Sequence, residues 1–268
     1  MFKKGLFKAV APLAAVSILL AACGADDSSN AGSSSDGEIT KLVAGTEATF
    51  APFEYMNESG EIVGIDREVL GAIADETGIE IEMRNVGWDP LFAQVKNNEI
   101  DLGASGITIN EKRKQDYDFT DPYYEATQVI VVKEGSTIAS LADLDDKKIS
   151  VQINTTGHEA AKKQFGETNL NISAFESLPV ALLEVINGST DAAIGDNTVV
   201  YEYLKNNPDA KLTVIEDDAF EKEYYGLMVK KGNEKVLEKL NEGLAKMKEN
   251  GKLDEIVEKY TGVKQGLE

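Results

Sequence analysis

From Lys41 onward, short apolar segments alternate with helical segments, and this alternation limits the possible folds more than any other feature of the sequence. Strand, helix and strand in repeated succession are typical of an α/β protein with largely parallel sheets. Residues that follow such strands gather at the carboxyl edge of a sheet, where open α/β sheets bind their ligands. We expect strands at 41–45, 79–84, 100–105, 148–153, 192–196 and 211–215.

Capping residues mark the ends of several segments between these strands. Asp66 can cap the start of a helix that ends at Gly78. The region 236–259 has the pattern of two amphipathic helices separated at Asn250 and Gly251. We expect this pair of helices to pack on a sheet.

The N-terminus has the organisation of a secretion signal. Three lysines precede an apolar run from Ala9 to Ala22. This run of 14 residues is shorter than the about 20 residues that a membrane-spanning helix needs. The run ends in LAAC, which resembles the lipobox of a bacterial lipoprotein and implies a signal peptide at 1–22 that is removed. By this resemblance Cys23 carries the lipid, including palmitate, and holds the protein on the outer face of the cell membrane.

The segment 23–38 is rich in Ser, Gly, Asp and Asn and has no apolar period. Such a composition favours a flexible tether over packed structure. We therefore expect folded structure to start close to Lys41, beyond a tether that connects it to the lipid anchor.

The composition excludes several kinds of site. Cys23 is the only cysteine and His158 the only histidine, so the chain can form neither an internal disulfide nor a thiolate or multi-histidine metal site. We find no calcium loop and no phosphate-binding glycine loop. The formal net charge of −20 becomes −23 when the three signal lysines are removed, which disfavours nucleic acid. We expect no metal, no cofactor and no nucleic-acid partner.

Residues 101–124 predict a site for a small carboxylate. A strand ends here in small residues, and Ser105 and Gly106 let a ligand approach the backbone closely. Thr108 then offers a hydroxyl and an N–H, and Arg113 lies in the first turn of a short polar helix. The guanidinium fork matches two carboxylate oxygens. A solvated surface arginine is the alternative.

Three further segments follow predicted strands and can face the same cleft. Glu47 and Phe50 lie in the loop after the first strand, and Trp88, the only tryptophan, lies between a strand and a helix. Thr156 lies at a helix start, where free N–H groups favour an anion. The alternatives are that both aromatic side chains belong to the core and that Glu47 is a solvated loop acid.

Two segments of the chain repeat one pattern. Residues 97–108 and 186–198 both run from a helix end through an aspartate and a small-residue strand to a polar turn. If they form equivalent edges of two lobes, Asp196 lies opposite Ser105 with a ligand between them. A shared preference at strand ends would produce the same pattern, and Asp196 can also cap the helix that follows it.

Seven motifs in a fixed order resemble those of the polar amino-acid-binding lipoproteins of ABC importers, family 3 of the extracellular solute-binding proteins. The likeness is closest to the arginine-, lysine- and histidine-binding branch and covers nearly all of the chain after the tether. The motifs are GTEATFAPFEY, GIDREVLGAIA, GWDPLF, DLGASGIT with EKRK, YDFTDPYY, VQINTTG and AAIGDNTVV.

This resemblance implies an α/β protein with the two-lobe fold of type II periplasmic binding proteins, the Venus flytrap, with two hinge strands. It places lobe 1 at 39–125 and 224–268, and lobe 2 at 126–223. The family closes its lobes on a ligand and delivers it to a membrane permease. We expect a monomer that is not an enzyme.

The resemblance also assigns roles to matching residues. It implies that Arg113, helped by the Thr108 N–H and by Thr156, pairs with the α-carboxylate of an L-amino acid. Asp196, with the hydroxyl and carbonyl of Ser105, holds the α-ammonium. The residues left for the side chain of the ligand are Phe50 and Trp88, which sandwich it, and Glu47 and Gln152, which contact its polar end.

Glu47 carries the expectation about specificity. A carboxylate beside two aromatic faces pairs best with a cation, which favours Arg or Lys side chains over neutral amides. We expect arginine in preference to lysine and histidine. The family more often has Asp where this chain has Glu47, and a neutral glutamine can also donate its amide hydrogens to this carboxylate. A glutamine-binding importer protein and, more remotely, a dehydratase of the same fold are therefore the alternatives.

Overall fold

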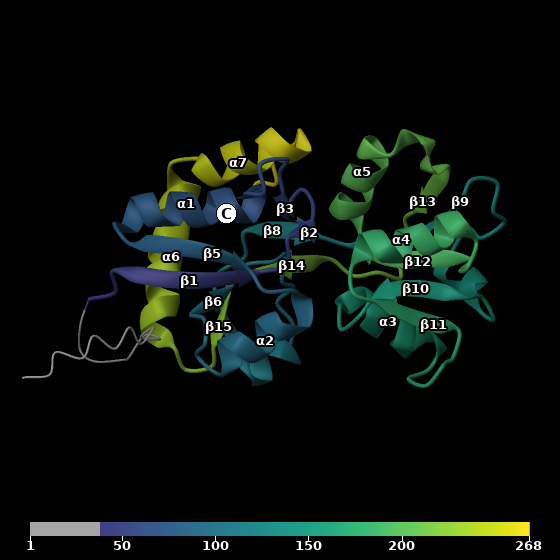
Figure 1. Cartoon of the computed structure of the whole chain (residues 1–268), viewed down its shortest axis with the longest axis horizontal. Coiled ribbons are helices and arrows are strands. Elements are labelled where there is room, and N and C mark those ends of the chain that lie inside the picture. The colour runs from purple at the N-terminus through teal and green to yellow at the C-terminus, as the bar shows by residue number, and fades with distance from the viewer. Residues whose placement is uncertain (1–37, 268) are drawn as a thin grey trace, which may run out of the picture. The chain divides into compact units, whose positions relative to one another are not determined.

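The computed structural model of the chain describes residues 38–267 as two five-stranded sheets with their helices (Figure 1). The predicted signal peptide, Cys23 and all but the last residue of the predicted tether lie outside the described residues. Within residues 38–267, no helix combines the length and the apolar character needed to cross a membrane.

The first sheet combines strands from distant parts of the chain (Figure 1). In spatial order its strands are β5 (Glu80–Asn85), β1 (Lys41–Thr46), β6 (Leu102–Gly103), β15 (Met228–Lys230) and β7 (Tyr117–Phe119). Strand β1 pairs in parallel with β5 and β6, whereas β15 runs antiparallel to β6 and β7.

Side chains of β1 alternate between the two faces of this sheet, as the pleat of a strand requires. Leu42 and Ala44 belong to a core that includes the buried side of α1 (Ile65–Thr77). Val43 packs instead with the cluster around α2 (Trp88–Lys96). Both faces of the sheet are thereby covered by helices.

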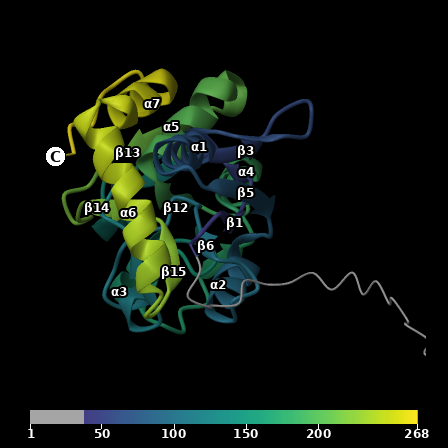
Figure 2. The ribbon, with the colours of Figure 1, turned by 90° about the vertical axis from the view of Figure 1, so that its left-hand side faces the viewer.

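The two C-terminal helices are present where the sequence predicts them. They are α6 (Glu234–Glu249) and α7 (Lys252–Thr261), and Gly251 between them adopts a left-handed conformation with φ of 77°. Their largest contacts are with α1 and with each other (Figure 2). The two helices were predicted to pack on a sheet, but they pack in large part on helix α1.

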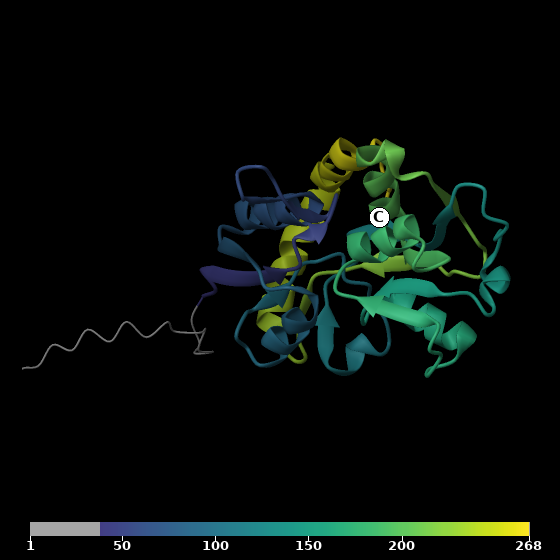
Figure 3. The same cartoon turned by 45° about the vertical axis from the view of Figure 1, so that its right-hand side comes forward.

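The second sheet has the same mixed character. In spatial order the strands are β11 (Ile172–Phe175), β10 (Ile149–Gln152), β12 (Ala192–Asp196), β9 (Gln128–Lys133) and β13 (Leu212–Ile215). Strand β10 pairs in parallel with β11 and β12, whereas β9 runs antiparallel to β12 and β13. Figure 3 shows both sheets with their helices.

Helices cover both faces of the second sheet as well. Ala193 belongs to the core shared with α4 (Leu178–Asn187) and α5 (Asn197–Asn206), whereas its neighbour Ile194 packs in the cluster that includes α3 (Thr156–Phe165). The smaller elements are β2 (Thr49–Phe50), β3 (Glu54–Met56), β4 (Ile62–Val63) and the 3₁₀ helices η1 (Arg113–Gln115), η2 (Leu141–Leu144) and η3 (Pro208–Ala210).

Two short strands lie between the sheets along the chain. They are β8 (Tyr124–Ala126) and β14 (Glu223–Tyr225), which pair antiparallel with Glu223 opposite Ala126. The chain passes through β8 from β7 to β9 and returns through β14 from β13 to β15. The structure thus has two sheet-rich lobes and two hinge strands, as predicted. The predicted lobe boundaries fall within β8 and β14 and stay a prediction.

All six predicted strands are present, but two local expectations were wrong. Strand β6 covers only two residues, and the chain bends at Ser105 and Gly106. Asp66 does not cap α1, whose N-cap is Gly64. The Asp66 carboxylate instead accepts the N–H of Gly106 (3.0 Å) and the hydroxyl of Tyr123 (2.7 Å). These buried donors outcompete the helix end for its oxygens.

The crossing of α6 over α1 predicts a cost for any side chain at Gly243. A Cβ atom there would lie 2.8 Å from Cγ2 and 3.1 Å from Cα of Ile73. We expect Gly243→Ala to lower the free energy of unfolding by about 1–2 kcal/mol, because overpacking outweighs the gain of up to about 1 kcal/mol in helix propensity. Urea denaturation measures this value. Exposed Ala245→Gly in the same helix is the control for propensity, and stabilisation by Gly243→Ala would contradict the packing argument.

Candidate functional site

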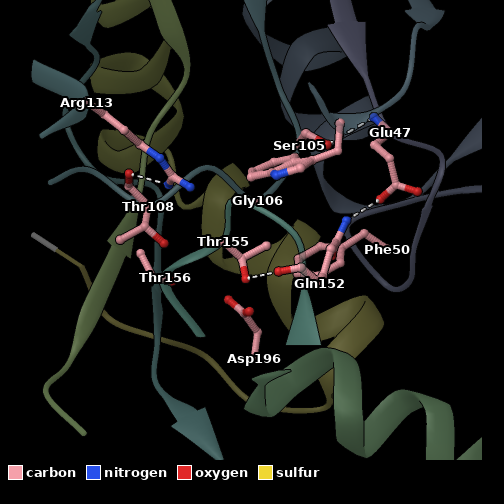
Figure 4. Close-up of a pocket in the computed structure, with 11 residues that line it drawn as sticks. Glu47, Phe50, Ser105, Gly106, Thr108, Arg113, Gln152, Thr155, Thr156 and Asp196 are labelled. Atoms are coloured by element: carbon pink, nitrogen blue, oxygen red, sulfur yellow. Dashed lines mark hydrogen bonds between the residues drawn. The ribbon is translucent and has the colours of Figure 1, made fainter. Parts of the chain in front are cut away.

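A pocket lies between the two lobes, and the space in it that no atom occupies, open solvent included, is about 290 Å³. All ten residues that the sequence predicts for the ligand site line it, and Thr155 is an addition (Figure 4). Their role in binding a ligand stays a prediction. The residues that line the pocket are Glu47, Phe50, Trp88, Ser105, Gly106, Thr108, Arg113, Gln152, Thr155, Thr156 and Asp196.

The topology explains why these residues meet. Ser105 follows β6 of the first sheet, Gln152 ends β10 of the second, and Asp196 ends β12. The carboxyl ends of strands from both sheets therefore face the same space, as expected for α/β ligand sites. The predicted placement of Ser105 and Asp196 at one site is consistent with this geometry.

Arg113 is held between a carbonyl and two aromatic rings. Its Nη1 donates to the carbonyl of Thr108 (2.8 Å), and its Cζ lies 5.5 Å from the ring centroid of Trp88 and 5.4 Å from that of Phe92. Burial lowers the pKa of Arg113, but a guanidinium remains charged in proteins. Phe92 is not among the predicted site residues, although its spacing of four residues from Trp88 on one helix indicates a shared face.

Asp196 ends its strand with a carboxylate that does not cap the next helix. It occupies the N-cap position of α5 without a side-chain bond to that helix, so the capping alternative was wrong. Its Oδ2 instead accepts the hydroxyl of Tyr225. Burial, followed by the charge of Glu223, raises the pKa of Asp196 to about 7. A cation beside Asp196 would favour its ionised form.

Glu47 is buried rather than solvated, with 7 % of its surface exposed. Its oxygens accept the hydroxyl of Thr49 and, at 3.5 Å, the amide Nε2 of Gln152. Burial raises the pKa of Glu47 to about 7 despite these two donors. This carboxylate therefore lacks a cationic partner within the described residues, and it lies at the edge of the pocket (Figure 4).

The floor of the pocket depends on a glycine and a buried acid. Gly106 has φ of 52°, and a Cβ there would lie 2.8 Å from Cε1 of Phe50. The Ser105 hydroxyl accepts the N–H of Glu47 (3.0 Å) and donates to Glu54 (2.6 Å). Glu54 is fully buried and does not line the pocket, so it braces Ser105 from below.

Comparison with known proteins shows the family of the chain. The model of the bacterial extracellular solute-binding proteins, family 3, matches residues 42–263. The chain belongs to this family. It is 36% identical to the arginine-binding extracellular protein ArtP of Bacillus subtilis (strain 168) over 98% of this chain and 100% of ArtP. It is 35% identical to a probable histidine-binding protein of Neisseria gonorrhoeae, over 93% of each chain.

A solved structure supports the same conclusion for the fold of this family 3 protein. The arginine-, lysine-, histidine-binding protein ArtJ from Geobacillus stearothermophilus is 50% identical to it, with a TM-score of 0.81 over 84% of this chain and 96% of ArtJ. Together these comparisons confirm the predicted family, the two-lobe fold and the expectation of a solute-binding protein rather than an enzyme.

The motifs of the solute-binding family do not include two residues that border the pocket from the hinge. Tyr225 donates to Asp196, and Glu223 accepts the hydroxyls of Thr108 and Thr156. Both belong to β14, and no pattern in the sequence of this strand indicates a ligand site. Among the described residues, no group of His, Cys, Asp and Glu side chains is placed to hold a metal ion.

The raised pKa of Glu47 predicts a pH-dependent stability of the ligand-free solute-binding protein. The pKa in the folded state, about 7, exceeds the ordinary value of 4.5, so the folded state loses stability as pH rises through this window. We expect Glu47→Gln to remove about 3 kcal/mol of this loss, so that the variant is more stable than the unaltered protein at about pH 8 but not at about pH 5. Urea titrations at both pH values measure the difference.

A matched control separates the burial of Glu47 from a general effect of charge. Glu58 is an exposed acid in the same part of the chain. Glu58→Gln should leave the pH dependence of the unfolding free energy unchanged. A Glu47→Gln variant whose stability parallels that of the unaltered protein across this pH range would contradict the argument.

Proposed function

We propose that this solute-binding protein captures a basic L-amino acid, arginine in preference to lysine and histidine. The charge of the pocket supports this proposal most strongly. Its lining holds one cationic residue, Arg113, and two acidic ones, Glu47 and Asp196, a net charge of −1 when all are ionised. A ligand with a net charge of +1 neutralises the pocket, whereas a zwitterion such as glutamine leaves one buried negative charge unpaired.

The backbone end of the ligand fits the two sides of the pocket. Arg113 has guanidinium N–H groups beyond the one that contacts Thr108, and these can form a two-pronged pair with the α-carboxylate. The α-ammonium donates hydrogen bonds to the carboxylate of Asp196, on the lobe opposite Arg113, and to the carbonyl of Ser105. Because the two charged ends of the ligand need groups from both lobes, binding favours closure.

The side chain of the ligand extends toward Glu47. Phe50 and Trp88, each 7 % exposed, provide flat surfaces for an alkyl stem or a planar guanidinium. Glu47 and Gln152 lie at 3.5 Å from each other and contact the polar end. The names of ArtP and of ArtJ state binding of arginine and of arginine, lysine and histidine, respectively, which agrees with this specificity.

The remaining parts of the proposal concern transport. We propose that lobe 1 comprises 39–125 and 224–268 and lobe 2 comprises 126–223, and that the closed monomer delivers its amino acid to the permease of an ABC importer. Cys23 carries the lipid that keeps the protein at the outer face of the membrane. The sequence pattern around Cys23 supports this anchor.

A calorimetric titration tests the proposed ligand. The purified protein is unfolded and refolded to remove bound solute, then titrated separately with arginine, lysine, histidine and glutamine. We expect tight binding of the cationic amino acids, with arginine first. Glu47→Gln should weaken arginine binding about 30-fold or more, because the ligand cation loses its buried partner, and should leave glutamine binding largely unchanged.

Other outcomes of the titration are equally informative. Tight binding of glutamine alone would support the pocket as the ligand site, with Glu47 accepting hydrogen bonds from the side-chain amide of the ligand instead of pairing with a cation. Equal losses of arginine and glutamine affinity in Glu47→Gln would remove this residue from the specificity role. Absence of binding for all four amino acids would contradict the proposed ligand class.

The lipid anchor is tested by substitution of Cys23. We expect Cys23→Ser to release the protein from the membrane fraction of producing cells into the medium or periplasm, because the lipid attached to Cys23 supplies the membrane affinity. Immunoblotting of the separated fractions measures this shift, with Ser29→Ala in the predicted tether as the control. Membrane retention of the Cys23→Ser protein would contradict lipidation at this site.

A further inference from the structure

The carboxylate of Glu223 collects three donors at one oxygen. Its Oε2 accepts the hydroxyl of Thr108 (2.7 Å), the hydroxyl of Thr156 (2.8 Å) and, at longer range, the amide Nε2 of Gln128 (3.4 Å). Hydrogen bonds to a charged acceptor are stronger than neutral ones. Both threonines line the pocket, whereas Glu223 does not.

The three partners come from different parts of the fold. Glu223 is the first residue of hinge strand β14. Thr108 lies between β6 and β7 of the first sheet and forms a bridge with Tyr225 of the same hinge strand, whereas Thr156 begins helix α3 of the second lobe. One carboxylate oxygen therefore connects a pocket residue of each lobe.

The backbone around Thr108 leaves its N–H directed away from the hinge strand. Ile109 N–H donates to the Tyr224 carbonyl, and Gly226 N–H donates to the Ile107 carbonyl. This arrangement makes Thr108 and Tyr225 a non-hydrogen-bonded pair of an antiparallel bridge. The Thr108 N–H consequently has no acceptor within the described residues, although its hydroxyl is engaged by Glu223.

Thr156 shows the same division of its two donors. As the first residue of a helix, it has an N–H without an intrahelical acceptor. Its hydroxyl donates to Glu223. In both threonines the side chain is held by the hinge acid, and the backbone N–H is left for an anion in the pocket.

We propose that Glu223 is a positioning residue that fixes Thr108 and Thr156 for the carboxylate of the ligand and holds the two lobes together in the closed form. This inference rests on the proposed function. Glu223 is the last residue of the proposed second lobe, so its bond to Thr108 of the first lobe breaks when the lobes separate, whereas its bond to Thr156 keeps that threonine in place within the second lobe. Glu223 consequently slows release of the ligand without contacting it.

The test compares Glu223→Gln, Thr156→Val and the double variant with arginine as the ligand. Thr156→Val removes the hydroxyl and keeps the backbone N–H. Trp88 is the only tryptophan and lines the pocket, so its fluorescence in stopped-flow experiments reports association and dissociation. We expect each single variant to raise the dissociation rate constant about tenfold, with little change in the association rate constant.

Coupling between the two residues separates positioning from general damage. We expect the double variant to dissociate about tenfold faster than the unaltered protein, instead of the about hundredfold that independent effects would give. The thermal midpoint of the ligand-free variants should stay that of the unaltered protein. Glu221→Gln removes the same charge from an exposed position two residues away and should leave both rate constants unchanged.

The outcomes distinguish this inference from the proposed function. If the unaltered protein binds arginine but Glu223→Gln releases it at the original rate, or if the two substitutions act independently, the positioning role is wrong. A similar increase of the dissociation rate constant in Glu221→Gln would show that the loss of a negative charge near the hinge is sufficient, and it would also overturn the positioning role of Glu223. If the unaltered protein binds no arginine, the proposed function fails and this inference fails with it.

Discussion

Incomplete pairing of buried charge governs the pocket. Glu47 and Asp196 are withdrawn from water, while Arg113 supplies the one guanidinium in the pocket lining. Charged groups are costly to bury unless they are paired, and the raised pKa values of both acids express that cost. A cationic amino acid would complete the pairing. In the proposed mechanism, this cost opposes closure without a ligand, and a cationic ligand offsets it.

The same local arrangement of the chain places pocket residues in both lobes. A short buried strand ends in small residues, and the chain then turns and exposes N–H groups or a polar side chain. β6 supplies Ser105 and Gly106 in this way, and β12 supplies Asp196. The hinge strands β8 and β14 bring the two strand ends together. β14 also adds Glu223 and Tyr225, which bond to the pocket residues of the second lobe.

Local patterns at strand exits and helix starts predicted the strands and nine of the ten expected pocket residues, whereas Gln152 was predicted only through the resemblance to the solute-binding family. The sequence did not predict Glu223 or Phe92 at the site, since these approach Thr156 and Arg113 only through tertiary contacts. Asp66 shows the opposite error. Its position suits an N-cap, yet its carboxylate bonds to Gly106 and Tyr123. Local capping preference predicts a partner only where no buried donor competes for it.

The interior position of β15 in the first sheet, between β6 and β7, has a consequence for how the molecule folds. The second sheet uses residues 128–215 without interruption, whereas the first needs residues 228–230 between β6 and β7. A chain that emerges with its N-terminus first, from a ribosome or across a membrane, can complete the second lobe while the first still lacks an interior strand. The usual order, in which N-terminal units fold first, is thereby reversed. The N-terminal strands of the first sheet, β1, β5 and β6, are synthesised before the second lobe but cannot complete their sheet until β15 is available. During that interval the first sheet presents unpaired strand edges to chaperones and proteases.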